Sequence, residues 1–95
     1  MNDSISTDSI PALNPLFRLQ YEEAQTSWVL LYPEGMVKLN QSAAEIMQRC
    51  DGNRDIKGIV NELEQAFDTT VAVSDVTGFV DVAIQQNWLT LKHTS

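Results

Sequence analysis

Side chains of the types that carry out chemistry are few in this chain of 95 residues. Its single histidine, His93, lies in the C-terminal tail, and its single cysteine, Cys50, falls on the apolar face of a predicted helix, where a thiol is normally buried and unreactive. Neighbouring acids fit surface charge better than acid–base catalysis; these are Glu22 with Glu23 and Glu62 with Glu64. A nucleophile–base pair, a multi-histidine or cysteine metal site and an internal disulfide all lack the residues they need. We expect a binding protein that is not an enzyme, with no metal and no cofactor.

Charge narrows the class of partner. Asp and Glu number 13 against 6 Lys and Arg, for a net charge of −7. Such a surface repels nucleic-acid phosphates and anionic lipid, so a peptide or protein partner is favoured over nucleic acid or membrane. The sequence has no signal-peptide pattern and no run of about twenty apolar residues, which predicts a cytoplasmic protein.

The first fifteen residues are rich in Ser, Asp, Thr, Asn and Pro. Their apolar members, Ile5, Ile10 and Leu13, follow neither a helix nor a strand period. We predict a disordered N-terminal arm over 1–15, a folded domain over 16–91 and a flexible tail over 92–95.

Three strands are predicted next. Residues 17–21 alternate between apolar and polar side chains, which predicts a strand with Phe17, Leu19 and Tyr21 facing inward. Residues 28–32 are apolar throughout, as expected of a central strand covered on both faces. Pro33 and Gly35 favour a tight turn, after which residues 36–39 form a short third strand with a free edge.

Three helices follow the strands. The first, over 41–50, is capped either by Asn40 or by Ser42 with Glu45, and Gly52 ends it. A second begins after Asp55 and carries an apolar stripe, and a third begins after Ser74 and runs to about residue 86. Trp88 and the residues after it predict a last short strand or an extended tail. The fold class is α+β, with a three-stranded antiparallel sheet followed by a three-helix bundle.

The third helix is more apolar than one core face requires. Val82 lies beside the main apolar stripe and widens the apolar arc to about 200°; the stripe itself consists of Val76, Phe79, Val80, Ala83 and Ile84. The helix is either buried on two sides, somewhat apolar on its surface, or the wall of a groove.

Three helices with a small sheet are also compatible with a winged-helix DNA-binding regulator, which is the alternative function. The charges argue against it. Residues 74–87 contain Asp75 and Asp81 and no Lys or Arg, so a recognition helix here would repel phosphates.

Several segments between Pro15 and Leu89 together resemble the PqqD family, peptide chaperones of pyrroloquinoline quinone (PQQ) biosynthesis; they are PLFRLQYE, LLYPEGMVKLNQSAAEIMQRCDG, IVNELEQAF, DV-x2-FV and NWL. The resemblance implies a winged-helix-like precursor-peptide recognition element with no activity of its own. It further implies an adaptor that binds the ribosomally made peptide PqqA and presents it to the radical SAM enzyme PqqE, which cross-links a Glu and a Tyr in that peptide.

In related recognition elements the peptide adds as a strand beside the third strand, against the third helix. Mapped onto this sequence, the resemblance implies a peptide-binding site made of Met36, Val37, Lys38, Leu39, Asp75, Val76, Phe79 and Val82. A homodimer that exchanges its sheet or helices about the turn at 33–35 is a further hypothesis, and it is compatible with the adaptor function.

Overall fold

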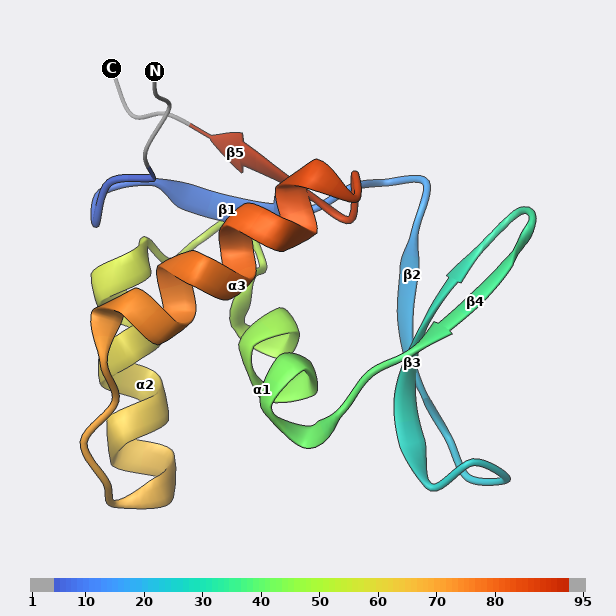
Figure 1. Cartoon of the computed structure of the whole chain (residues 1–95), viewed down its shortest axis with the longest axis horizontal. Helices are drawn as coiled ribbons and strands as arrows, with labels where there is room; N and C mark the ends of the chain where they lie inside the picture. The colour runs from blue at the N-terminus through green and yellow to red at the C-terminus, as the bar shows by residue number, and fades with distance from the viewer. Residues whose placement is uncertain (1–4, 93–95) are drawn as a thin grey trace.

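A computed structural model describes residues 5–92. Strands β2, β3 and β4 form one antiparallel sheet in that order, and helices α1, α2 and α3 pack to one side of it (Figure 1). The elements are β1 Ile10–Leu13, β2 Arg18–Glu22, β3 Ser27–Tyr32, β4 Gly35–Lys38, α1 Gln41–Arg49, α2 Ile56–Phe67, α3 Val73–Gln85 and β5 Leu89–Lys92. The predicted α+β class, with a three-stranded antiparallel sheet and three helices, is confirmed.

The central position of β3 is also confirmed. Val29 and Leu30 are fully buried, and β3 pairs with β2 on one side and β4 on the other. Tyr32 pairs with Gly35 across the predicted tight turn. Tyr21 differs from its prediction, because it is 47% exposed and packs edge-on against Trp28 with the ring centroids 5.7 Å apart. Tyr21 lies near the end of the edge strand β2, where the helices do not cover the sheet.

Local capping explains where two of the helices begin. The Asn40 side chain accepts a hydrogen bond from the Ala43 N–H at 2.8 Å, which selects Asn40 over Ser42 as the α1 cap. The Asp55 side chain accepts from the Gly58 N–H at 2.8 Å, as predicted for α2. Ser74 is not the α3 cap, because α3 begins at Val73, two residues earlier than predicted, and its cap residue Ala72 provides no side-chain hydrogen bond.

The hydrophobic core lies between the sheet and the three helices. It contains Leu30 from β3, Ile46 from α1, Ile59 from α2 and Val76 from α3. Cys50, which follows the last residue of α1, is buried in this core and donates its thiol hydrogen to the Ile46 carbonyl at 3.2 Å. Burial, with a smaller contribution from the Asp51 carboxylate, raises the pKa of the Cys50 thiol to about 12.

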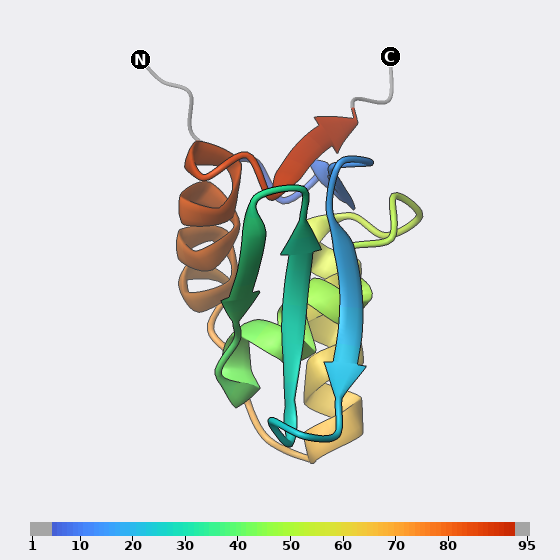
Figure 2. The ribbon, with the colours of Figure 1, turned by 90° about the vertical axis from the view of Figure 1, so that its right-hand side faces the viewer.

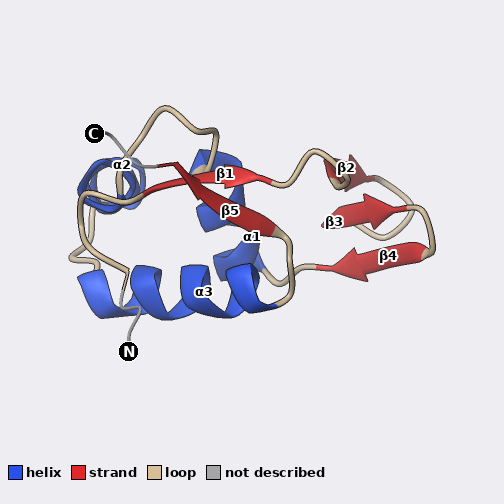
Figure 3. Cartoon of the chain, turned by 90° about the horizontal axis from the view of Figure 1, so that it is seen from above, coloured by secondary structure: helices blue, strands red, loops and turns tan. Residues whose placement is uncertain are grey.

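The prediction that residues 1–15 form a disordered arm is wrong for Ile10–Leu13. These residues form β1, which pairs antiparallel with β5 across the top of the helices (Figures 1 and 3). Pro11 is fully buried, and its carbonyl accepts a hydrogen bond from the Gly52 N–H at 3.1 Å. A stretch of four residues that contains a proline is too short to show the alternation typical of a strand, and its partner strand lies at the other end of the chain.

Lys92 belongs to β5, so the tail predicted over 92–95 begins no earlier than residue 93. Residues 1–4 and 93–95, which include His93, lie outside the described residues. No helix within 5–92 is long and apolar enough to cross a membrane.

Candidate functional site

One edge of β4 has no strand partner among residues 5–92. Leu39, just past β4, donates its N–H to the Trp28 carbonyl at 2.9 Å. Successive residues of an antiparallel strand direct their backbone groups alternately toward and away from the partner strand. Since Val37 lies opposite Leu30 in the same register, it also faces β3. The N–H and C=O groups of Met36 and Lys38 therefore point outward at the free edge.

A cavity of about 470 Å³ lies between the end of β4 and α3. Figure 2 shows β4 and α3 next to each other on the same side of the molecule. We call this cavity the β4–α3 groove; it is lined by Lys38, Leu39, Asn40, Ser42, Ala43, Ile46, Asp75, Phe79, Val82 and Trp88. Its position lets a chain that pairs with β4 place side chains into the groove.

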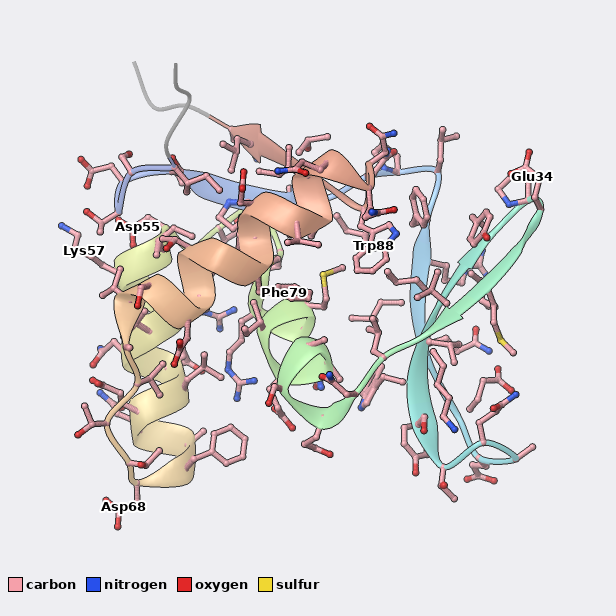
Figure 4. The ribbon with its side chains drawn as sticks, in the orientation of Figure 1. Glu34, Asp55, Lys57, Asp68, Phe79 and Trp88 are labelled. Atoms are coloured by element: carbon pink, nitrogen blue, oxygen red, sulfur yellow. The ribbon has the colours of Figure 1, made fainter. Side chains whose placement is uncertain are left out.

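Two aromatic rings form one end of the groove. Phe79 and Trp88 have ring centroids 6.5 Å apart with an interplanar angle of 44°. In Figure 4, Trp88 lies in the space between α3 and the β2–β4 sheet. The backbone N–H of Trp88 donates a hydrogen bond to the Ala83 carbonyl at 2.8 Å, and Asn87 before it has a positive φ of 66°. This tight turn after α3 holds the indole on the groove side of the helix.

The structure brings most of the predicted site residues together. Lys38 and Leu39 from the β4 side and Asp75, Phe79 and Val82 from α3 all line the groove. Met36 lies on the strand edge and is 45% exposed, whereas Val37 is half-buried and packs against the core.

Val76 is fully buried and belongs to the core. It therefore does not line the β4–α3 groove, because α3 turns that face toward α1 and α2.

Sequence reasoning missed the floor of the groove. Ser42, Ala43 and Ile46 come from α1, Asn40 is the cap of that helix, and Trp88 comes from the turn after α3. Ala43 and Ile46 fall within the first predicted helix, and Trp88 was expected to open a last short strand or an extended tail. Their apolar character was a signal for burial, but the relative placement of α1 and α3 depends on tertiary packing that no local pattern records.

The groove carries one unpaired charge at each side. Lys38 and Asp75 are both exposed, and neither forms an ion pair with any residue from 5 to 92. A ligand with complementary charges can therefore pair with both sides without displacing an internal partner.

Comparisons with known proteins agree on the family. The profile of the family described as "Coenzyme PQQ synthesis protein D (PqqD)" matches residues 27–89. A protein of Pseudomonas aeruginosa named "PqqA binding protein" is 48% identical over 88 residues, which cover 92% of this chain and 96% of the relative. A protein of the same name from Methylococcus capsulatus is 41% identical over 86 residues, covering 90% and 92%.

Solved structures share the fold. The solution NMR structure of the PqqD truncation of Methylobacterium extorquens PqqCD, described as a functional and stand-alone RiPP recognition element, matches with a TM-score of 0.68 at 24% identity over 90% of this chain and 94% of that chain. The heterocyclase TruD matches with a TM-score of 0.67 at 19% identity, over 88% of this chain and 12% of that chain. At these identities the structural likeness shows the fold alone, whereas the profile match and the sequence relatives show that the chain belongs to the PqqD family.

Proposed function

We propose that this chain acts in the cytoplasm as a peptide adaptor of PQQ biosynthesis. It binds the precursor peptide PqqA as an added strand on the free edge of β4 and presents it to the radical SAM enzyme PqqE. The observation that carries the proposal is the open β4 edge beside the mainly apolar β4–α3 groove. Membership of the PqqD family and the name "PqqA binding protein" of the relatives support PqqA as the peptide.

Strand addition needs unpaired backbone groups and a place for side chains. Met36 and Lys38 supply the outward N–H and C=O groups, which bind any peptide backbone in the same way. Side chains at alternate positions of the added strand then point toward the groove, where Phe79 and Val82 form an apolar wall. The backbone contacts thus supply affinity, and the groove supplies selection among sequences.

The chain has a binding role in this proposal, and the cross-linking of Glu and Tyr in PqqA belongs to PqqE. Cys50 is not available as a nucleophile, because it is buried and its thiol pKa is raised to about 12. The exposed α3 acids Asp75 and Asp81 disfavour a DNA-binding role for this helix. Exchange of structural elements between two copies stays a prediction, which a concentration series of scattering masses tests.

An NMR titration of the ¹⁵N-labelled chain with synthetic PqqA tests the binding step. We expect the largest amide shifts at Met36 and Lys38 and at Phe79 and Val82, together with a shift of the Trp88 indole. A scrambled PqqA peptide is the control. Shifts confined to the β2 edge, or equal responses to both peptides, would refute the proposed docking.

The presentation step needs a separate assay. PqqE is incubated with PqqA, S-adenosylmethionine and a reductant, with and without this chain, and the Glu–Tyr cross-linked peptide is measured by mass spectrometry. We expect the cross-linked fraction to rise with the chain and to fall again with a variant that no longer binds PqqA. An unchanged fraction would show that the chain binds the peptide without presenting it.

A further inference from the structure

A second cavity of about 300 Å³ adjoins the β4–α3 groove. We call it the interhelical cavity, because α1, α2, α3 and the loop before α3 surround it; it is lined by Gln41, Ser42, Glu45, Ile46, Leu63, Phe67, Thr69, Val71, Asp75 and Val76. Ser42, Ile46 and Asp75 belong to the walls of both cavities. The two cavities are therefore neighbours that meet at the start of α3.

The wall of the interhelical cavity is held in place by specific contacts. The Glu64 side chain accepts a hydrogen bond from the Val71 N–H at 3.0 Å, and the Glu64 carbonyl accepts from the Thr69 N–H at 3.3 Å. Asp68, which ends α2, has a left-handed conformation with φ 52°. These contacts turn the chain sharply after α2 and keep the loop away from α1.

An exposed aromatic ring lies at the rim. Phe67 is 49% exposed although it continues the apolar stripe of α2. Arg49 lies over this ring, with its guanidinium carbon 5.9 Å from the centroid, and is fixed by an ion pair with Glu45 at 2.9 Å. An exposed ring beside an apolar cavity is typical of a contact surface for an apolar side chain of a partner.

The interhelical cavity lies on the path of a strand added to β4. Gln41 and Ser42 follow the end of β4 by only three and four residues and line this cavity. A peptide that extends beyond Lys38 by a few residues, at about 3.3 Å each, therefore passes the boundary between the two cavities. This holds for either direction of the peptide.

Asp75 stands at that boundary. It is exposed, lines both cavities, and makes no ion pair and no side-chain hydrogen bond with residues 5–92. Its place in the first turn of α3 stabilises the helix through the helix dipole. That role does not depend on the cavities, whereas attraction of a basic ligand residue does, so the two roles can be separated by experiment.

We propose that the interhelical cavity binds an apolar side chain of the same peptide, outside the segment that pairs with β4, and that Asp75 selects a basic residue between the two anchored segments. This inference rests on the proposed function. It specifies the ligand as a peptide with a strand-forming segment, a Lys or Arg next to it and an apolar or aromatic residue beyond.

Two pairs of matched variants test the inference, with fluorescently labelled PqqA as the probe and anisotropy as the readout. Asp75→Asn removes the charge at the boundary, and Asp81→Asn removes the same charge from an exposed position of α3 that lines neither cavity. We expect Asp75→Asn to weaken binding about threefold to tenfold, because a partly desolvated charged contact is lost, and Asp81→Asn to change it less than twofold. Raising the salt concentration should reduce the difference between the two variants.

The second pair tests the effect of blocking the interhelical cavity. Thr69→Trp places a large side chain in the wall, and Thr70→Trp places it at the next exposed residue, which lines neither cavity. We expect Thr69→Trp alone to weaken binding. Replacing each Lys and Arg of PqqA by Gln, one at a time, then identifies the partner of Asp75. The replacement of that partner should have little further effect on binding to the Asp75→Asn variant, because the interaction is already lost.

The outcomes separate the inference from the proposed function. If the native chain does not bind PqqA, the proposed function fails. If the native chain binds PqqA but each variant matches its control in affinity, the inference is refuted and the proposed function stands. Thermal unfolding of all four variants shows whether any loss of binding comes from loss of the fold.

Discussion

Two proline substitutions in β4 discriminate between the two sides of its backbone, and a third in β2 is their control. The Val37 N–H faces Leu30 of β3, whereas the Met36 N–H points to the free edge. Proline removes the N–H and adds a ring at that position. We expect Val37→Pro to damage the fold and Met36→Pro to leave the fold intact while blocking strand addition.

The expected magnitudes follow from what each N–H contacts. Val37→Pro leaves the carbonyl of the fully buried Leu30 without its donor, which costs about 1–3 kcal/mol, in addition to the steric effect of the ring. Met36→Pro removes an exposed N–H, so the free energy of unfolding should change by no more than about 0.5 kcal/mol. One lost hydrogen bond to the peptide, about 0.5–1.5 kcal/mol, weakens binding about twofold to tenfold, and the ring clash adds to this loss.

The opposite edge supplies the matched control. Because Leu30 directs its backbone groups to β4, Val29 and Leu31 direct theirs to β2, and the Leu19 and Tyr21 groups point outward at the β2 edge. Tyr21→Pro therefore places the same ring on the other free edge. We expect it to leave PqqA binding unchanged.

Urea unfolding gives the stability of the three variants, and anisotropy with labelled PqqA gives their affinity. The reasoning would be refuted if Met36→Pro bound PqqA as tightly as the native chain. It would be refuted equally if Tyr21→Pro caused the larger loss, because the peptide would then occupy the β2 edge.

Three further predictions concern stability. Because the pKa of the Cys50 thiol rises from 9.0 to about 12 on folding, only the unfolded state loses this proton between those values, so the free energy of unfolding should fall by about 1.4 kcal/mol per pH unit from pH 9 to pH 12. Urea unfolding at several pH values should show that the free energy of unfolding of Cys50→Ala falls less steeply with pH. Equal pH dependence in the native chain and the variant would exclude this thiol as the cause. Gly52→Ala should destabilise the fold by about 1–2 kcal/mol, because φ is +82° and a Cβ would lie 3.3 Å from that of Ala12. Gly78→Ala should stabilise it by up to about 1 kcal/mol, because a Cβ there would have no atom of residues 5–92 within 4 Å outside its own helix turn. Thermal unfolding compares the two variants. Deletion of residues 1–13 should lower the unfolding temperature strongly, since it removes β1, and an unchanged temperature would mean that β1 contributes nothing to stability.

Local patterns in the sequence predicted most of the fold. The apolar run at Trp28 to Tyr32 indicated the central strand, and Asn40 and Asp55 marked two helix starts by their capping chemistry. The β1–β5 pair escaped prediction, because its register joins Ile10 to Lys92 across nearly the whole chain. The same limit applies to the site. The wall residues on α3 were predictable as surplus apolar surface, whereas the floor from α1 and the second cavity arise only from how three helices pack.

The short β4 edge explains why the cavities are needed. Two outward-facing residues allow at most four backbone hydrogen bonds, worth together about 2–6 kcal/mol. Association costs about 4–15 kcal/mol in lost translational and rotational freedom, so strand addition alone cannot hold a flexible peptide. In the proposed binding mode, apolar side chains buried in the β4–α3 groove and in the interhelical cavity supply the rest, at about 25 cal/mol per Å² of apolar surface. A four-residue edge with Lys38 on it is also a poor template for pairing with other copies, so the open edge and the two cavities together favour a peptide that fits both.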